Sequence, residues 1–334
     1  MKICVVGAGA IGGMIAARLA ETGHEVTAIC RGANLAAIRK QGGLRLIWED
    51  GTEYFGKLRA TDSTAEAGPQ DYVILAVKAH QVAPLLDGLP ALCDARTSIV
   101  TMQNGIPFWY FHRHGGAFEG RNVEAVDPGG AIARSIPIER IIGSVVYPAS
   151  ELTEPGVIRH IEGNRFTLGE PDHSESERVA VLAEALREAG YKAPVTTDIR
   201  SEIWLKLWGN LTFNPISALT HATLEELCTY PPTRALAVEI MTEAQAIGEK
   251  LGVTFRVPIE RRIAGAQAVG RHKTSMLQDV GAGRALELDA LVGAVLELGR
   301  LTGTPTPHID TLYACTKLLD KMLQDYSGRL WIEY

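Results

Sequence analysis

The glycine pattern near the N-terminus constrains the fold of this chain more than any other feature. An apolar run from Lys2 to Val6 leads into Gly-x-Gly-x-x-Gly and then into a helix-forming stretch. In such a turn the first glycine permits the tight bend, the second lets a phosphate approach the backbone, and the third lets the helix pack on the strand. The pattern predicts a pyrophosphate site made by Gly7, Ala8, Gly9, Ala10, Ile11 and Gly12.

The residue at the end of the second predicted strand indicates which dinucleotide is bound. NAD sites usually place an acidic residue there, about 20 residues past the glycines, where it binds the ribose 2′-hydroxyl. This chain has Cys30-Arg31 at that point. A guanidinium is a planar, permanently charged fork that suits a phosphate. The sequence therefore favours NADP(H), with Arg31 on the 2′-phosphate; a solvated arginine at a strand end is the alternative.

Composition limits the classes of protein that need consideration. With 334 residues, 46% of them hydrophobic, the chain can form two domains. A formal net charge of −6 gives no basic field for nucleic acid. No run of about 20 apolar residues predicts a membrane span. Five scattered cysteines without Cys-x-x-Cys spacing indicate a reduced, cytoplasmic protein, and His112-Arg113-His114 lacks the further ligands that a metal site needs.

Hydrophobic periodicity changes character along the chain. Strands alternate with helices in the first part, where residues 71–77 and 97–101 read as buried parallel strands joined by a crossover over 82–92. Short runs at 141–147, 157–161 and 166–168 predict an antiparallel extension of this sheet. Helical periodicity then covers residues 198–213, 233–251, 258–271, 286–302 and 306–325. The predicted fold is an α/β Rossmann-type dinucleotide-binding domain over residues 1–197, followed by an all-helical substrate domain over residues 198–334.

A polar stripe marks the first helix of the second domain. Lys206, Asn210 and Asn214 are spaced four apart, so each lies about 40° further round the helix and the three share one face. One cation and two amides could order a small polyoxygenated substrate. Pro215 is expected to end or kink the helix, because it lacks an N–H and its ring clashes with the preceding turn. An ordinary ion pair of Lys206 with Glu202, and asparagines that merely cap the helix, are the alternatives.

Three further sites carry polar residues. Lys78 and Asn104 follow predicted strands at their carboxyl ends, where open α/β sheets bind ligands, although a solvated cation and a simple turn fit equally well. Ser275 begins Ser-Met-Leu-Gln-Asp and precedes Glu287. A helix N-cap and a surface acid are the alternatives for these two residues.

Taken together, these motifs resemble the ketopantoate reductase (2-dehydropantoate 2-reductase) family from residue 2 to about residue 325. The resemblance rests on the glycine pattern with Arg31, on Ala76-Val77-Lys78, Gln103-Asn104-Gly105 and Trp204-x-Lys206-Leu207-x-x-Asn210-x-x-x-Asn214-Pro215, and on Ser275-Met276-Leu277-Gln278-Asp279 with Glu287-x-Asp289. It implies NADPH-dependent reduction of 2-dehydropantoate to (R)-pantoate in pantothenate biosynthesis.

The same resemblance assigns roles to these side chains. Lys206 would be the general acid that protonates the alkoxide forming at C2, and Glu287 would hold the lysine and the substrate hydroxyl in place. The substrate-binding residues would be Asn104, Asn210, Asn214 and Ser275, and Lys78 with Asn104 would set the geometry of the nicotinamide ribose and the substrate. Hydride chemistry brings cofactor and substrate together from two sides, so the active site is expected in a cleft between the domains.

Two departures from the family pattern concern the substrate pocket. His272 stands where an asparagine is expected three residues before Ser275, and Leu224 stands where one is expected ten residues after Asn214. A reductase of another branched or hydroxylated 2-oxo acid is therefore an alternative, and a non-catalytic NADP(H)-binding regulator is a second. The aromatic segment 108–128 is expected to reshape the mouth of the cleft. A largely apolar helical domain makes a homodimer plausible.

Overall fold

The computed structural model describes residues 1–326, and the chain divides into two compact units. The first comprises Met1–Asn122 and Gly129–Ile199, and the second comprises Val123–Pro128 and the chain from Arg200 onward. The first is α/β and the second is helical, so the predicted fold class is confirmed. The chain enters the helical unit twice, briefly at residue 123 and finally at residue 200.

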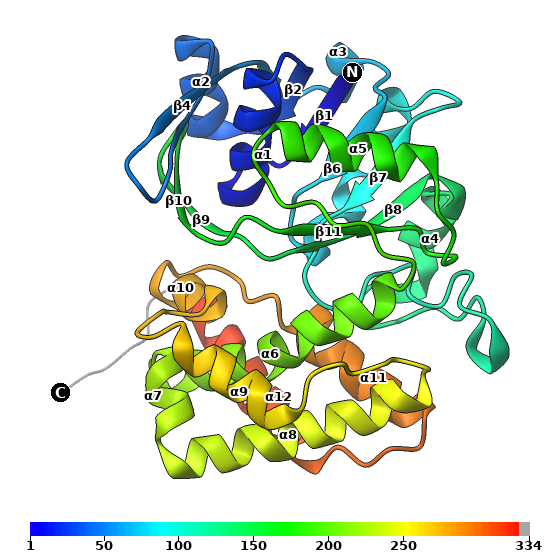
Figure 1. Ribbon diagram of the computed structural model, residues 1–334, viewed down its shortest axis with the longest axis vertical. Coiled ribbons are helices and arrows are strands. Elements are labelled where there is room, and N and C mark those ends of the chain that lie inside the picture. Colours follow the sequence, from blue (N-terminus) through cyan, green and yellow to red (C-terminus); the bar gives the residue numbers. More distant parts are fainter. Residues whose placement is uncertain (327–334) are drawn as a thin grey trace. The chain divides into compact units, whose positions relative to one another are not determined.

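A seven-stranded sheet forms the centre of the α/β unit (Figure 1). All neighbouring strands are parallel except β11, which pairs antiparallel with β8. The predicted antiparallel extension is confirmed for β11, whereas β8 extends the sheet parallel to β7 and corrects the prediction for residues 141–147. In order across the sheet the strands are β11 (Phe166–Gly169), β8 (Ile141–Val146), β7 (Ser98–Thr101), β6 (Tyr72–Leu75), β1 (Lys2–Val6), β2 (Glu25–Ile29) and β5 (Arg59–Thr61).

A second sheet corrects one prediction. Residues 157–162 form β10, which does not extend the main sheet but pairs parallel with β3 and antiparallel with β9. Helix α1 (Ala10–Glu21) is buried along most of its length because it contacts strands of both sheets. A short run of alternating apolar and polar residues predicts a strand but does not determine which strand it pairs with. The prediction for residues 157–161 failed for this reason. The four strands in order are β4 (Glu53–Lys57), β3 (Gly43–Ile47), β10 (Val157–Glu162) and β9 (Ala149–Glu154).

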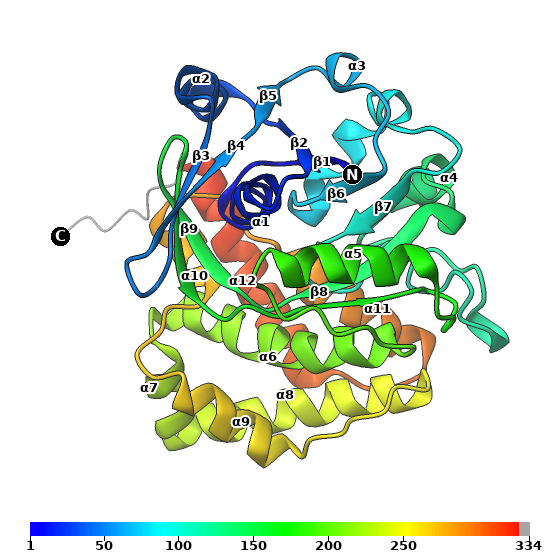
Figure 2. The same ribbon diagram turned by 45° about the horizontal axis from the view of Figure 1, so that its top comes forward.

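The connections in this unit are mostly short. The crossover over 82–92 contains two 3₁₀ turns in place of a longer helix, and each has a proline near its start, Pro84 and Pro90. The last helix of the unit, α5, contacts β11, and Figure 2 shows this helix in green. Besides α1, the α-helices of the unit are α2 (Gly32–Gln41), α3 (Thr64–Ala67), α4 (Ala131–Ser135) and α5 (Glu177–Glu188).

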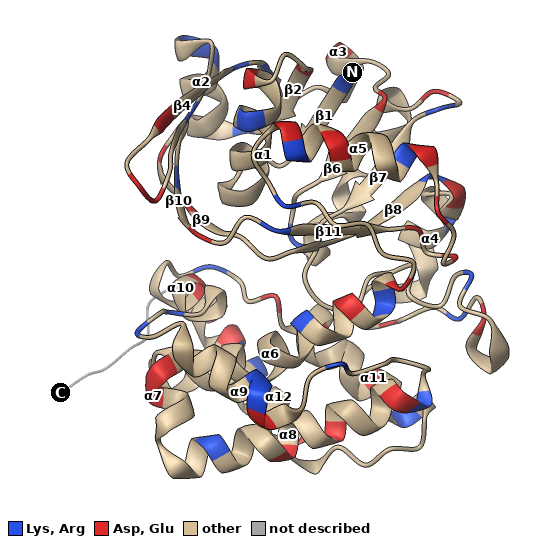
Figure 3. Cartoon of the chain, in the orientation of Figure 1, with Lys and Arg blue, Asp and Glu red and all other residues tan. Residues whose placement is uncertain are grey.

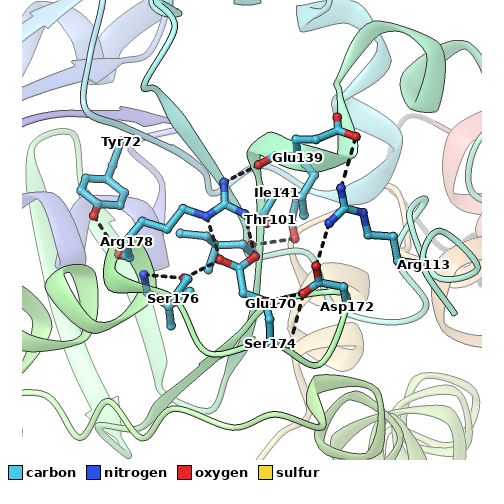
Figure 4. Close-up of polar contacts among 12 residues, drawn as sticks. Tyr72, Thr101, Arg113, Glu139, Ile141, Glu170, Asp172, Ser174, Ser176 and Arg178 are labelled. Atoms are coloured by element: carbon cyan, nitrogen blue, oxygen red, sulfur yellow. Dashed lines mark hydrogen bonds and ion pairs between the residues drawn. The ribbon is translucent and has the colours of Figure 1, made fainter.

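A hydrogen-bonded ion pair anchors the start of α5 to the main sheet (Figure 4). Glu170 is 4% exposed, and its two carboxylate oxygens accept hydrogen bonds from Arg178 Nε and Nη2 at 2.7 and 2.6 Å. Arg178 Nη2 also donates to the carbonyl of Ile141 at 3.1 Å. Ser176 Oγ donates to Glu170 at 2.6 Å and accepts from the backbone N–H of Val179. The buried carboxylate is thereby compensated by charge and by hydrogen bonds.

The helical unit contains the predicted helices, but those over 198–213 and 286–302 differ from the prediction. Acidic and basic residues are interspersed along the helices of this unit (Figure 3). Helix α6 continues through Pro215 to Thr220, so the predicted end at residue 213 is wrong. Pro215, Ile216 and Ala218 are buried, and this packing stabilises a helix that proline alone would disfavour. The helices are α6 (Ile199–Thr220), α7 (Leu224–Thr229), α8 (Pro231–Lys250), α9 (Ile259–Ala268), α10 (Ser275–Gly281), α11 (Ala294–Leu301) and α12 (Pro307–Asp325).

The predicted helix over 286–302 is shorter and less regular than expected. Glu287 lies before the helix, and a π-helical turn over Asp289–Gly293 precedes α11. Asp289 accepts hydrogen bonds at 2.8 Å from Tyr313 Oη and from Lys317 Nζ, both on α12. A π turn within an α-helix is uncommon and is often found near functional residues.

Most Phe, Trp and Tyr side chains of the segment 108–128 are buried, and Phe118 is partly exposed. Trp109, Tyr110 and Phe111 are at most 1% exposed, and Trp109 Nε1 donates to Thr101 Oγ1 at 2.9 Å. Because these rings are buried, the aromatic content of the segment does not support the expected reshaping of a cleft mouth. Within residues 1–326, no helix is long and apolar enough to cross a membrane, and no group of three or more potential metal ligands is present.

Candidate active site

The phosphate loop, residues 7–12, has the backbone that its glycines predict. Gly7 has φ of +98°, where a side chain is strained, and a Cβ on Gly12 would lie 2.0 Å from the carbonyl oxygen of Gly7. Gly9 precedes α1 and borders open space, since a Cβ there would meet no heavy atom within 4 Å. The loop therefore combines a close turn, an accessible backbone and a helix N-terminus, which is the arrangement that binds a pyrophosphate.

Four predicted residues follow four adjacent strands. Strands β7, β6, β1 and β2 are neighbours, and Asn104, Lys78, Gly7 and Arg31 come within three residues of their respective ends. Because the strands are parallel, these four positions lie next to one another along the same edge of the sheet, in the order of the strands. The strand order reverses at β1, and ligands of open α/β sheets bind at such a point.

Gln103 connects two of the loops at this edge. Its Nε2 donates to the carbonyls of Leu75 at 2.7 Å and Val77 at 3.1 Å. The segment carrying Asn104 is thus tied to the segment carrying Lys78, and both of these side chains are partly buried. Gln103 stands in the motif Gln103-Asn104-Gly105, but that motif alone does not predict this link.

Arg31 lies at the start of α2 with an extended backbone and an exposed side chain. It follows β2 by two residues, at the position where dinucleotide-binding folds recognise the adenosine ribose. An exposed guanidinium at this point can accommodate a phosphate. Because an arginine occupies the position, there is no carboxylate here to accept a hydrogen bond from a ribose 2′-hydroxyl.

The helical unit brings the second group of predicted residues together. Lys206, Asn210 and Asn214 lie on α6, and Asn214 Nδ2 donates to Ser275 Oγ at 3.4 Å across 61 residues of sequence. Ser275 is exposed and is the first residue of α10; Thr274 is the N-cap, because its hydroxyl accepts from the backbone N–H of Leu277. Ser275 is therefore not the capping residue that we considered as an alternative.

The ionisation of Lys206 is perturbed. Burial lowers the pKa of its ammonium group to about 8, and the negative charge of Glu287 opposes this shift. Lys206 is partly buried on α6, and Glu287 comes from the segment just before the π turn. A lysine with this pKa carries a proton at neutral pH and can release it far more readily than an ordinary lysine.

The two departures from the family pattern lie side by side. The backbone N–H of Leu224 donates to the carbonyl of His272 at 3.0 Å. Leu224 is the first residue of α7, and His272 precedes Ser275 by three residues. Both changes thus alter one region of the helical unit, and His272 lies three residues from Ser275 in sequence.

Comparisons with known proteins identify the family. A family model described as ketopantoate reductase PanE/ApbA matches residues 3–173, and one described as ketopantoate reductase PanE/ApbA C terminal matches residues 198–320. The chain belongs to the ketopantoate reductase family. It is 58% identical to the 2-dehydropantoate 2-reductase of Mesorhizobium japonicum, over 96% of this chain and 98% of that protein. It is thus an oxidoreductase of the ketopantoate reductase type.

Solved structures of this family share the fold. The crystal structure of 2-dehydropantoate 2-reductase from Geobacter metallireducens GS-15 has a TM-score of 0.84 at 27% identity, covering 96% of this chain and 100% of that one. D-mandelate dehydrogenase in a ternary structure with NADH and anilino(oxo)acetate has a TM-score of 0.81 at 24% identity, covering 97% and 99%. The second likeness shows a common fold alone.

Proposed function

We propose that this protein reduces 2-dehydropantoate to (R)-pantoate with NADPH, in pantothenate biosynthesis. The observation that carries the proposal is Lys206, an amine whose pKa burial lowers to about 8, on the same helical face as two asparagines and paired electrostatically with Glu287. The full-length similarity to a curated 2-dehydropantoate 2-reductase supports the substrate.

The residues of the phosphate loop fit a dinucleotide. The backbone of Gly9 and the first turn of α1 would hold the pyrophosphate, and Arg31 would bind the 2′-phosphate of NADPH. Lys78 and Asn104 would orient the nicotinamide ribose from the neighbouring strands. When bound, NADPH supplies the hydride that reduces the substrate carbonyl.

The helical unit supplies the acid and the substrate contacts. Lys206 donates a proton to the oxygen on C2, and before this transfer its positive charge stabilises the developing alkoxide. Glu287 raises the pKa of Lys206 and so keeps the amine protonated in the resting enzyme. Asn210, Asn214 and Ser275 bind the carboxylate and hydroxyl groups of the substrate.

The direct test is a substrate panel. Purified protein is mixed with NADPH and with each of several 2-oxo acids, and loss of NADPH absorbance is followed. The proposal expects the highest kcat/KM for 2-dehydropantoate and chiral chromatography to give the (R) product. Turnover of every other acid with none of 2-dehydropantoate would contradict it.

Replacing Arg31 with alanine is expected to raise the KM for NADPH by about 10- to 100-fold, because hydrogen bonds to a charged group contribute about 1.5–3 kcal/mol. The KM for NADH should stay within twofold of the wild-type value, since NADH lacks the 2′-phosphate. Steady-state kinetics with both nucleotides makes the measurement. Arg39→Ala, an exposed arginine on the same helix, is the matched control. Equal losses for the two nucleotides would refute the phosphate contact.

The pH dependence of reduction should reflect Lys206. Because the protonated amine is the acid, kcat/KM is expected to be level below pH 8 and to fall about tenfold per pH unit above it. Glu287→Gln removes the charge that raises this pKa, so its profile should break at lower pH. Profiles of kcat/KM for both proteins provide the measurement. Identical break points would exclude Glu287 as the partner of Lys206.

A second candidate function is reduction of a different branched or hydroxylated 2-oxo acid. The observation that favours it is the adjacency of His272 and Leu224, which changes one part of the region near Ser275. The fold does not choose between substrates, since D-mandelate dehydrogenase shares it. The panel described above separates the two candidates when it includes branched and aromatic 2-oxo acids.

The cellular setting is also a proposal. The five cysteines are free thiols, and burial raises the pKa of the Cys4 thiol to about 12, which makes it unreactive. We infer a reducing compartment, the cytoplasm, in keeping with a biosynthetic enzyme. The homodimer remains a prediction, which light scattering on the purified protein tests.

A further inference from the structure

Asn34 joins three segments of the α/β unit that are far apart in sequence. It lies in the first turn of α2, three residues after Arg31, and its side chain is partly buried. Its Nδ2 donates to the carbonyl of Ala8 at 2.6 Å, and its Oδ1 accepts from the backbone N–H of Gly156 at 2.8 Å. Ala8 belongs to the phosphate loop, and Gly156 forms the turn between β9 and β10.

We propose that Asn34 is a positioning residue for the dinucleotide, acting through the phosphate loop. The proposal rests on the dinucleotide site described above and extends it to a residue that does not itself touch the cofactor.

The effect follows from the geometry of one peptide group. The bond between Ala8 and Gly9 is trans, so its carbonyl and its N–H point in opposite directions. By binding the carbonyl of Ala8, Asn34 sets the plane of this peptide and directs the N–H of Gly9 away from α2. Gly9 borders open space in front of α1, where the pyrophosphate would lie. Without Asn34 the loop has to be ordered when the dinucleotide binds, which lowers affinity.

The turn at Gly156 gives Asn34 a fixed support. Gln41, at the other end of α2, donates from Nε2 to the carbonyls of Gly43 at 2.7 Å and Gly156 at 3.0 Å. Arg45 donates its backbone N–H to the same carbonyl of Gly156 at 3.0 Å. Gln41 therefore binds the same turn as Asn34, but both of its acceptors lie outside the phosphate loop. This difference makes Gln41 a matched control.

The test measures binding of NADPH and NADH separately, by isothermal titration calorimetry on the full-length protein. Asn34→Ala is expected to raise the Kd of both nucleotides by about tenfold, because both contain the pyrophosphate. Asn34→Asp keeps the acceptor for Gly156 but places an oxygen against the Ala8 carbonyl, so its Kd values should rise at least as much. Gln41→Ala should lower the Tm while both Kd values stay within twofold of wild type.

Three outcomes would overturn the proposal. If Asn34→Ala and Gln41→Ala lower the Tm alike and leave both Kd values unchanged, Asn34 is only structural. If Asn34→Ala weakens NADPH alone, it acts through Arg31 and not through the loop. If the wild-type protein binds neither nucleotide, the dinucleotide site itself is wrong. Nucleotide binding with the expected pattern, but no reduction of any 2-oxo acid, would contradict the proposed function and leave the role of Asn34 supported.

Discussion

Replacing Lys206 with alanine is expected to lower kcat for the 2-oxo acid by about 10²- to 10⁴-fold, the usual contribution of a positioned general acid. The amine is the group that we assign to the proton transfer, and its pKa of about 8 suits a donor that works near neutral pH. The Kd of NADPH should remain within twofold, since the phosphate loop and Arg31 belong to the α/β unit. Single-turnover and steady-state kinetics, with calorimetry for the nucleotide, give these values.

Two further variants separate acid catalysis from charge. Lys206→Arg keeps a positive charge but holds its proton too tightly to donate it, so it should recover little of the lost kcat. Lys321→Ala removes an exposed lysine from α12 and should behave as wild type. Full activity in Lys206→Ala would remove this residue from the mechanism. Full activity in Lys206→Arg would leave electrostatic stabilisation as its role.

Replacing Arg178 with alanine is expected to reduce the free energy of unfolding by about 3 kcal/mol. The change would leave the carboxylate of Glu170 buried without its charged partner, and such losses cost about 3–5 kcal/mol. Because Arg178 is 30% exposed, water can reach part of the vacated site and the lower end of the range applies. Urea unfolding followed by circular dichroism would measure the change.

The same helix provides the control for this prediction. Arg187 pairs with Glu184 on α5, and both side chains are about half exposed, so Arg187→Ala should cost no more than about 1 kcal/mol. A loss in Arg178→Ala no larger than that in Arg187→Ala would show that the ion pair in Figure 4 contributes little to stability.

Glycine placement and hydrophobic periodicity predicted the phosphate loop and most helices and strands, but not which distant strands pair. The phosphate loop followed from its glycines, because Gly7 needs a positive φ and Gly12 has no room for a Cβ. The second sheet did not follow, since the pairing of β10 with β3 joins residues more than a hundred positions apart. The continuation of α6 beyond Pro215 depends on burial of the residues after it, which helix propensity does not record.

The candidate site shows the same division. A spacing of four residues was enough to place Lys206, Asn210 and Asn214 on one face of α6. Periodicity could not predict that Ser275 meets Asn214, although the family resemblance placed both among the substrate-binding residues. Asn34 was missed because its two partners lie 26 and 122 residues away, and a single asparagine near a helix start gives no signal of either contact.

The brief passage of the chain through residues 123–128 has a consequence for protein engineering. Glu297 on α11 accepts hydrogen bonds from the backbone N–H groups of Glu124 and Ala125 at 2.9 and 2.8 Å, so this hexapeptide is part of the framework of the helical unit. A chimera that exchanges the helical units of two relatives therefore needs junctions after residues 122, 128 and 199. With a single junction at residue 199, the helical unit would come from one relative and residues 123–128 from the other. The hydrogen bonds between Glu297 and the backbone of Glu124 and Ala125 would then join segments of two different proteins.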